Sequence, residues 1–137
     1  MNINHRSSLR VRYAETDLMG FVWNGVYNTY FEIGRTEVMR YLGLTYSELE
    51  AKGIQLPLIE SYARYIQPGK YDDVLEVETN IVYEGGVRLK FEYNILRDNS
   101  TITKGYTLHT FIDSVSKKPI KPPKEFLDVW EKLNKEN

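Results

Sequence analysis

A carboxylate stands shortly before a long helical pattern in the segment ETDLMGFVWNGVYNTYFEIGRTEVMR, residues 15–40. Glu15 and Asp17 are its first acidic residues, and Gly20 and Gly25 flank a run of bulky apolar side chains. A carboxylate can act as a nucleophile or a general base, while unpaired N–H groups at the start of a helix can hold an anionic oxygen. The segment therefore contains both a carboxylate and a helix N-terminus, the groups needed for attack on a carbonyl carbon without a metal ion.

Composition excludes several other kinds of site. The 137-residue chain has no cysteine, which rules out disulfides, thiolate nucleophiles and zinc sites built on sulfur. Its two histidines, His5 and His109, are isolated from each other, so we expect no metal site. Because 18 basic and 19 acidic residues leave a net charge of -1, we expect neither nucleic acid nor a membrane surface as a partner.

Length and hydropathy predict one globular domain, residues 1–137. The 42% hydrophobic share is enough for a core, so the chain is not disordered. The N-terminus MNINHRSSLRVRY lacks the apolar core of a signal peptide, and no segment approaches 18 consecutive apolar residues. We therefore expect a soluble, cytoplasmic protein.

The elements that must position the acidic segment can be predicted from periodicity. Alternation over Leu9–Tyr13 predicts a short strand just before it. Apolar residues then recur at helical spacing until Gly43 ends the pattern. This stripe consists of Tyr27, Tyr30, Phe31, Gly34, Val38, Tyr41 and Leu42. A capping box at Thr45 predicts a second, short helix as far as Lys52.

The second half of the chain has mostly strand patterns. The predicted strands are 56–67, 75–83, 87–95 and 101–113, and residues 124–135 form a predicted terminal helix. Helical patterns in the first half of the chain and strand patterns in the second half predict an α+β fold with an antiparallel sheet. One long helix covers only one face of such a sheet and leaves an edge open, so we expect a dimer joined edge to edge.

Several motifs in one order resemble the hotdog-fold acyl-CoA thioesterases of the 4-hydroxybenzoyl-CoA thioesterase type. The matching residues of the first segment are Arg12-Tyr13, Glu15-Thr16-Asp17, Met19-Gly20, Val22-Trp23, Tyr27, Tyr30-Phe31-Glu32 and Gly34-Arg35-Thr36-Glu37. Later matches are Arg64-Tyr65 with Pro68, Tyr71-Asp72-Asp73, Leu75-Glu76-Val77, Arg88 to Tyr93, and His109 to Asp113 with Lys118-Pro119. The resemblance implies an antiparallel sheet wrapped around a central helix, homodimers or homotetramers with sites at the dimer interface, and hydrolysis of an acyl-CoA without a cofactor.

The resemblance also implies roles at the site. Asp17 matches the catalytic carboxylate, which either attacks the carbonyl to form a mixed anhydride or activates a water. The backbone N–H of Asn24 is the expected oxyanion donor. A large subgroup of the family has a histidine where this chain has Asn24, a departure that bears on substrate class more than on reaction type.

Substrate contacts follow from the same match. Gly20 and Gly25 are expected to let the backbone approach the substrate, Tyr27 to line an acyl pocket, and Arg88 to contact the phosphates of CoA. The expected neighbours of Arg88 in the phosphate site are Arg64, Lys70 and Lys90, although surface solvation is the more common role of each such residue.

Other titratable residues have alternative interpretations. Glu32 and Glu37 lie off the buried stripe and fit solvated or ion-paired side chains, but another hotdog branch uses a carboxylate on this helix. Glu15 is interpreted as an electrostatic neighbour or a surface residue. His109 falls within a strand, where a structural hydrogen-bonding role is favoured, and we expect His5 to lie in a mobile terminus.

Two other functions remain open from the sequence. One is hydrolysis of an acyl chain carried by acyl carrier protein, which would dock through a basic patch. The other is a non-catalytic module that binds acyl-CoA in the same pocket. Asp17 argues against simple binding, because binding does not need a carboxylate beside a thioester. A hotdog dehydratase fits less well, since His109 lacks an evident partner.

Overall fold

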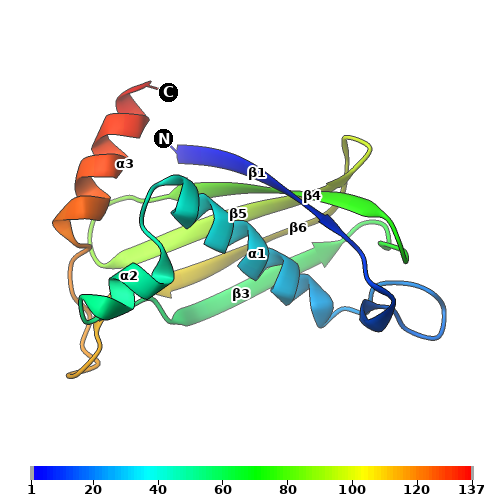
Figure 1. Cartoon of the computed structure of the whole chain (residues 1–137), viewed down its shortest axis with the longest axis horizontal. Coiled ribbons are helices and arrows are strands. Elements are labelled where there is room, and N and C mark those ends of the chain that lie inside the picture. Colours follow the sequence, from blue (N-terminus) through cyan, green and yellow to red (C-terminus); the bar gives the residue numbers. More distant parts are fainter. Residues whose placement is uncertain (1, 137) are drawn as a thin grey trace.

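The computed structural model describes residues 2–136 (Figure 1). Its strands are β1 (Asn2–Arg10), β2 (Ile54–Gln55), β3 (Leu58–Tyr65), β4 (Val74–Val82), β5 (Arg88–Arg97), β6 (Ser100–Thr110) and β7 (Ile112–Asp113). Its helices are α1 (Val26–Tyr41), α2 (Tyr46–Ala51) and α3 (Lys124–Glu136), with a 3-10 turn η1 (Tyr13–Glu15). The predicted α+β class and antiparallel sheet are confirmed.

Five strands form one antiparallel sheet in the order β1-β4-β5-β6-β3, which curves around α1 (Figure 1). β4 and β5 make the predicted hairpin, in which Val77 lies opposite Ile95 and Ile81 opposite Phe91. All four of these side chains are fully buried. Because their neighbours along each strand face the other side, the period-2 patterns correctly predicted which face of the hairpin is covered.

The central helix α1 lies on the inner face of the sheet because one stripe of its side chains is apolar. Tyr30, Phe31, Val38 and Met39 have no exposed surface, and the ring of Phe31 stacks on Tyr93 of β5 with 4.3 Å between centroids. Burying each such side chain contributes roughly 1.5–3 kcal/mol. Packing on the sheet therefore fixes where the helix lies more than helix propensity does.

The helix comes very close to β4 at Gly34. A Cβ on this residue would overlap side-chain atoms of Thr79 and Val77. The missing side chain therefore sets the distance between α1 and β4, and through it the position of the whole helix over the sheet.

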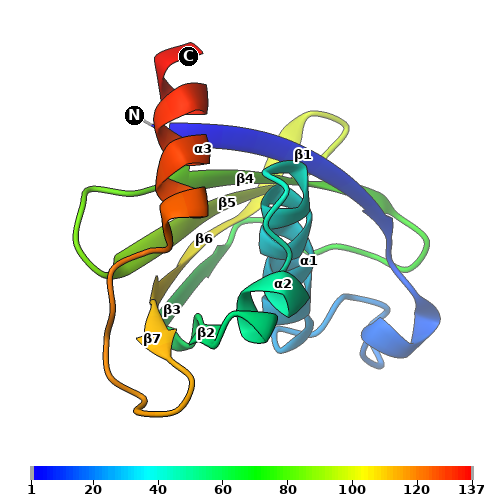
Figure 2. The ribbon, with the colours of Figure 1, turned by 60° about the vertical axis from the view of Figure 1, so that its left-hand side comes forward.

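α3 packs near the beginning of β1 (Figure 2). Its buried face carries Phe126, whose ring centroid lies 5.5 Å from Phe111 and 5.5 Å from Tyr83, together with Trp130. The terminal helix predicted from the spacing of apolar residues in 124–135 is therefore confirmed. None of the helices formed by residues 2–136 combines the length and apolar character needed to cross a membrane.

The first strand differs from its prediction. β1 runs over Asn2–Arg10 instead of Leu9–Tyr13, and Tyr13 lies in η1 with 78% of its surface exposed. β1 pairs along its whole length with β4, so the neighbouring strand, rather than its own polar sequence, makes it a strand. The prediction of a mobile terminus at His5 is therefore wrong, since its ring lies in β1, 5.0 Å from that of Tyr41.

Two details of other elements also need correction. Tyr41 was expected on the buried stripe of the central helix but is 58% exposed, whereas Met39 is fully buried. The predicted strand 101–113 is divided into β6 and β7 at Phe111. There the N–H of Phe111 donates to the carbonyl of Val87, and its own carbonyl accepts the N–H of Ile120, both at 2.8–2.9 Å.

β3 ends the sheet on the side opposite β1 and is exposed along most of its length. Leu58, Ile59, Tyr62 and Tyr65, together with Ile66 just after the strand, are 47–52% exposed. A strand edge with apolar side chains offers both backbone pairing and apolar surface to another chain.

Candidate active site

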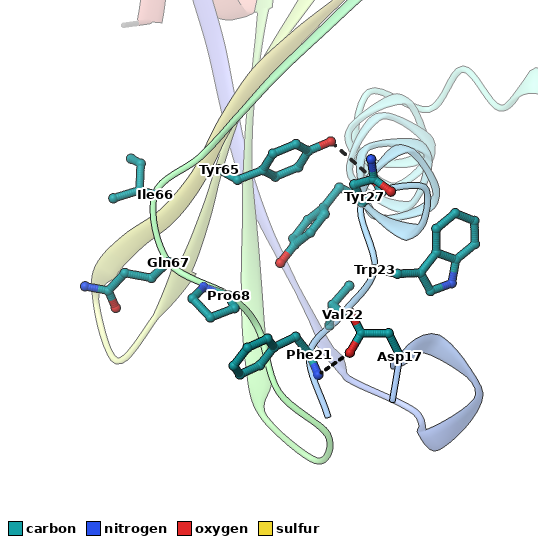
Figure 3. A pocket seen from close by; sticks show the side chains of 10 residues that line it. Asp17, Phe21, Val22, Trp23, Tyr27, Tyr65, Ile66, Gln67 and Pro68 are labelled. Atoms are coloured by element: carbon teal, nitrogen blue, oxygen red, sulfur yellow. Dashed lines mark hydrogen bonds between the residues drawn. The ribbon is translucent and has the colours of Figure 1, made fainter. Parts of the chain in front are cut away.

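The segment between η1 and α1 folds into a tight loop that starts at Asp17 (Figure 3). Thr16 and Val22 pair across its base as an isolated bridge. The Asp17 N–H donates to the Phe21 carbonyl at 2.8 Å, and the Gly20 N–H donates to the Asp17 carbonyl at 3.0 Å. Gly20 has a φ of +80°, a conformation that side chains disfavour, so the turn itself requires this glycine.

The Asp17 side chain closes the loop with one of its two carboxylate oxygens. Oδ1 accepts hydrogen bonds from the N–H groups of Met19 at 2.9 Å and Phe21 at 3.1 Å. Within the part of the chain that the structure describes, Oδ2 accepts no hydrogen bond. The carboxylate is exposed and lines a cavity, so one oxygen orients the group and the other is available to a ligand.

A cavity of about 410 Å³ lies between this loop and the end of β3 (Figure 3). This volume is within the range of small-molecule sites. One wall consists of Asp17, Phe21, Val22, Trp23, Asn24 and Tyr27, and the other of Tyr65, Ile66, Gln67 and Pro68. The lining combines apolar and aromatic side chains with polar groups from Asp17, Asn24 and Gln67, which suits a ligand that has an apolar part and a polar reacting group.

The N-terminus of α1 borders this cavity at Asn24. Among residues 2–136, no acceptor is bonded to the N–H groups of Asn24 and Gly25. The Asn24 carbonyl accepts the Tyr27 N–H at 3.3 Å and the Tyr65 hydroxyl at 3.4 Å. Unpaired N–H groups at the positive end of a helix dipole make a site for an anionic oxygen.

Gly25 lies against the indole of Trp23. A Cβ on Gly25 would overlap the six-membered part of that ring. The φ of Gly25 is -64°, an ordinary value for any residue, so space rather than backbone conformation requires glycine here. Trp23 thereby flanks the helix terminus while half of it stays exposed.

Tyr27 is the predicted pocket residue that lies deepest, with 3% of its surface exposed. Its hydroxyl accepts the N–H of Gly69 at 3.1 Å, and its ring centroid is 5.0 Å from that of Tyr65 (Figure 3). Tyr27 therefore both lines the cavity and connects α1 to the loop that follows β3.

Residues 11–129 match the family model described as the thioesterase-like superfamily. The chain belongs to this superfamily. It is 34% identical over 134 residues to YneP of Bacillus subtilis, covering 95% of this chain and 97% of that protein. It is 31% identical over 118 residues to the acyl-CoA thioesterase YbgC of Haemophilus influenzae, covering 85% of this chain and 87% of that one.

A solved structure similar to this thioesterase-like protein is the DHNA-CoA thioesterase of Staphylococcus aureus. The two share a TM-score of 0.90 and 26% sequence identity, over 96% of this chain and 91% of that chain. The hotdog fold expected from the sequence motifs is therefore confirmed, with α1 as the central helix.

Glu15 was interpreted as either an electrostatic neighbour of Asp17 or a surface residue, and the surface alternative is wrong. Glu15 is 8% exposed, and its carboxylate accepts the Arg12 N–H at 2.9 Å, the Arg12 guanidinium at 3.1 Å and the Tyr30 hydroxyl at 3.0 Å. Burial alone raises the pKa of Glu15, but these hydrogen bonds outweigh it and hold the pKa below its ordinary value. Glu15 therefore ties the loop region to α1.

The structure does not bring Arg88 together with Asp17. Arg88 begins β5 opposite Thr110 of β6, and the turn between β4 and β5 lies at the opposite end of the sheet from the Asp17 loop (Figure 1). Of the other cations considered for phosphate contact, Lys70 lies beside the loop, in an isolated bridge with Phe21. The role of Arg88 in this thioesterase-like chain stays a prediction.

The remaining candidates lie outside the cavity. Glu32 is exposed, and Glu37 pairs with Arg40 at 3.5 Å, as expected for solvated helix side chains. His109 is buried and hydrogen-bonded through both ring nitrogens, so its structural interpretation is confirmed. No group of three His, Asp or Glu residues within 2–136 is placed to hold a metal ion.

Sequence reasoning missed the second wall, formed by Tyr65, Gln67 and Pro68 among others. These residues reach the cavity because the loop after β3 pairs with the Asp17 loop, where the Val22 N–H donates to the Gly69 carbonyl at 2.8 Å. The predicted strand 56–67 ends just before Pro68, but no local pattern indicates which distant loop the residues after that strand contact.

Proposed function

We propose that this protein hydrolyses acyl-CoA thioesters in the cavity beside Asp17. The observation that carries the proposal is that the Asp17 carboxylate and the N-terminus of α1 at Asn24 border the same cavity. A carbonyl oxygen held at that terminus can present its carbon to the carboxylate. The substrate class is supported by the family and by relatives that are themselves acyl-CoA and DHNA-CoA thioesterases.

Thioester hydrolysis needs little leaving-group assistance, because a thiolate leaves readily. The main requirement is stabilisation of the negative charge that develops on the carbonyl oxygen. We assign this to the unpaired backbone N–H of Asn24, helped by that of Gly25 and by the helix dipole. One oxyanion donor is typically worth about 10²- to 10³-fold in kcat, and a backbone donor does not depend on which side chain occupies position 24.

Asp17 can complete the reaction by either of two routes. As a nucleophile, its carboxylate attacks the carbonyl carbon, the C–S bond breaks and CoA leaves as thiolate, after which water hydrolyses the mixed anhydride. As a general base, it takes a proton from a water that attacks directly, and the tetrahedral intermediate then expels the thiolate. Both routes yield the free acid and CoA and restore the carboxylate.

The proposal includes a homodimer, or a tetramer built from two dimers. Tyr65 and Ile66 at the end of β3 form part of the cavity wall, and β3 is an exposed edge. Pairing of this edge with β3 of a second copy would cover the edge and enclose the open side of the cavity.

The test is CoA thiol release from short, long and aromatic acyl-CoAs by the parent and Asp17→Asn. Asparagine keeps an oxygen for the two loop N–H groups, so the loop should persist while the charge is lost. Asp113→Asn is the matched control, since Asp113 Oδ1 accepts the Val115 and Ser116 N–H groups at 2.9 and 2.8 Å in a similar turn outside the cavity. We expect Asp17→Asn to lose about 10² in kcat or more and Asp113→Asn to keep parental rates.

Other outcomes would redirect the assignment. Parental rates in folded Asp17→Asn would contradict it, and Glu32→Gln and Glu37→Gln would then be measured. Rates far higher on an acyl chain carried by acyl carrier protein would favour that substrate over CoA. Tight acyl-CoA binding with no hydrolysis by any variant would replace the enzyme with a binding module.

A further inference from the structure

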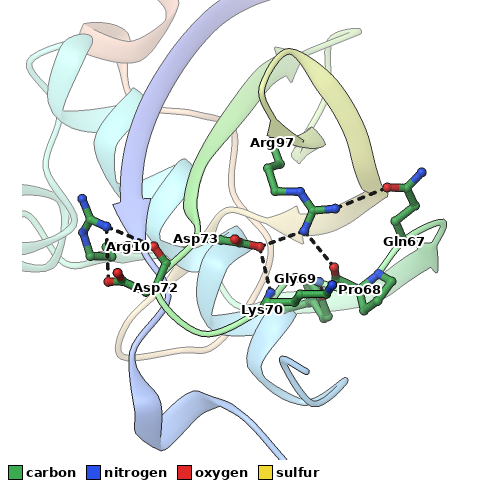
Figure 4. A network of polar contacts seen from close by, with 9 residues as sticks. Arg10, Gln67, Pro68, Gly69, Lys70, Asp72, Asp73 and Arg97 are labelled. Carbon is green, nitrogen blue, oxygen red and sulfur yellow. Dashed lines mark hydrogen bonds and ion pairs between the residues drawn. The ribbon is translucent and has the colours of Figure 1, made fainter. Parts of the chain in front are cut away.

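Residues 66–73, which we term the wall loop, connect β3 to β4 (Figure 4) and supply three of the four residues in the second wall of the cavity, Ile66, Gln67 and Pro68. Its inner side contacts the site. The Gly69 carbonyl accepts the Val22 N–H at 2.8 Å, and the Gly69 N–H donates to the Tyr27 hydroxyl at 3.1 Å. A Cβ on Gly69 would lie 3.2 Å from Val22 Cγ2, so the two loops are already in close contact.

Two arginines hold the outer side of the wall loop (Figure 4). Arg10 donates to the carbonyl and the carboxylate of Asp72 in an exposed contact, near the end of the loop that leads to β4. The second arginine lies nearer the cavity. Arg97, at the end of β5, donates to the Pro68 carbonyl at 3.0 Å, to Asp73 Oδ2 at 2.8 Å and to Gln67 Oε1 at 3.3 Å. The same Asp73 oxygen accepts the Lys70 N–H at 2.9 Å. Arg97 and Asp73 are only 25% and 23% exposed, so this charge-assisted contact is screened less than a pair on the open surface.

The wall loop is also linked to the Asp17 carboxylate through one residue. Lys70 and Phe21 form an isolated antiparallel bridge. The N–H of Phe21 donates to Asp17 Oδ1 at 3.1 Å, and its carbonyl accepts the Asp17 N–H at 2.8 Å. A shift of the wall loop would therefore move the backbone that orients the carboxylate.

We propose that Arg97 and Asp73 are positioning residues for Asp17 and for the second wall of the cavity, an inference that rests on the proposed function. Neither side chain lines the cavity. They act by fixing the wall loop, which in turn fixes Phe21, Val22 and Tyr27. Because a displacement of about 1 Å from a distant substitution can cost about 10²-fold in rate, these two residues should affect turnover without touching the substrate.

The ion pair between Arg6 and Glu78 provides a matched control. Arg6 contacts Glu78 at 3.0 Å, and the Glu78 side chain is 22% exposed, close to the 23% of Asp73. This pair joins β1 to β4 and has no member in the cavity wall. Arg97→Met and Arg6→Met each remove one guanidinium from a similarly exposed carboxylate. Only Arg97→Met also removes contacts with the wall loop, at Pro68 and Gln67, so the comparison separates fixing of that loop from the loss of an ion pair.

The experiment measures kcat and KM on the acyl-CoA that the parent hydrolyses fastest, with folding checked by circular dichroism. We expect Arg97→Met and Asp73→Ala each to lower kcat by about 10- to 100-fold, with a smaller change in KM, and Arg6→Met to stay within about twofold. The double variant should fall by less than the product of the two single losses, because both changes break the shared contact between Arg97 and Asp73. An Arg97→Met rate within twofold of the parent, an equal loss in Arg6→Met, or losses that multiply in the double variant would overturn the proposal.

Amide hydrogen exchange over residues 17–27 gives a readout that does not depend on activity. Arg97→Met should accelerate exchange there relative to Arg6→Met, and equal exchange in the two variants would refute positioning. If Arg97→Met fails to fold, Arg97→Lys replaces it, since lysine keeps the charge but not the fork of donors. A parent that hydrolyses no acyl-CoA would refute the proposed function, while the exchange comparison would still decide the positioning role.

Discussion

Asp17 uses one carboxylate oxygen to hold its own loop and leaves the other for a ligand. Asp113 closes a similar turn with its Oδ1 but does not line the cavity that Asp17 lines. The difference between the two aspartates therefore lies in what surrounds them. At the residue scale, the proposed catalytic role of Asp17 is therefore supported by the unpaired N–H groups that border the same cavity, and not by the residue type or the turn.

His109 illustrates a titratable residue whose function is in the core. A carbonyl can only accept, so Nδ1 carries the proton and donates to Leu56 at 3.1 Å, while Nε2 accepts the Thr107 hydroxyl at 2.9 Å. Tyr93 extends the chain, with its hydroxyl 2.6 Å from that of Thr107. Burial lowers the pKa of His109 to about 4, so the ring is neutral in the folded protein at neutral pH.

This histidine should make the free energy of unfolding depend on pH. The unfolded chain takes up a proton near pH 6.5 and the folded chain only near pH 4, so stability is present above 6.5 and is lost as the pH falls toward 4. The difference corresponds to about 3 kcal/mol. Urea unfolding at pH 7, 5.5 and 4 should show a smaller loss of stability in His109→Gln than in the parent; parallel losses would contradict the buried neutral state.

At the scale of elements, the parts with strong local patterns were predicted well. The β4–β5 hairpin, α1 and α3 each carry a repeating apolar face, and each formed where the period predicted. The part of β1 that precedes Leu9 could not be predicted, because its polar residues form a strand only by pairing with β4. The wall loop was missed for a related reason, since its conformation depends on Arg97 and the Asp17 loop, both far away in sequence.

The contact between α1 and β4 gives a stability prediction. Gly34→Ala gains about 1 kcal/mol of helix propensity but introduces a Cβ that overlaps Thr79 and Val77, and overpacking costs typically about 1–3 kcal/mol. We expect a net loss of up to about 2 kcal/mol in the free energy of unfolding measured with urea. Thr29→Ala, on the exposed side of the same helix, should be slightly stabilised; a Gly34→Ala variant that gains as much would show that the close approach is not required.

At the scale of the whole molecule, sequence motifs predicted the fold and three residues that line one wall of the cavity. Asp17, Asn24 and Tyr27 belong to one continuous segment, so their match indicated a common site. The second wall comes from another part of the chain, and its place depends on how two loops meet over the end of the sheet. In the proposed dimer the open side of the cavity would depend on a second chain, which no single sequence pattern specifies.

A substitution in the edge strand β3 tests the proposed dimer. Ile59 of β3 is 47% exposed, and Ile59→Lys would bury a charge if β3 pairs with a second copy. An unpaired buried charge costs at least about 3 kcal/mol, which is more than about 100-fold in the dimer dissociation constant. Sedimentation should therefore show a multiple of the 16.1 kDa chain mass for the parent and mostly monomer for the variant.

Activity should follow assembly in the same samples. We expect acyl-CoA hydrolysis by Ile59→Lys to fall in proportion to its monomer fraction, because the monomer leaves the β3 side of the cavity open. Val115→Lys is the control, since Val115 is 90% exposed in the loop after β7 and should change neither mass nor rate. A parent that sediments as a monomer at full activity would place the complete site within one chain, and Tyr65 and Ile66 would then form an open wall that needs no partner.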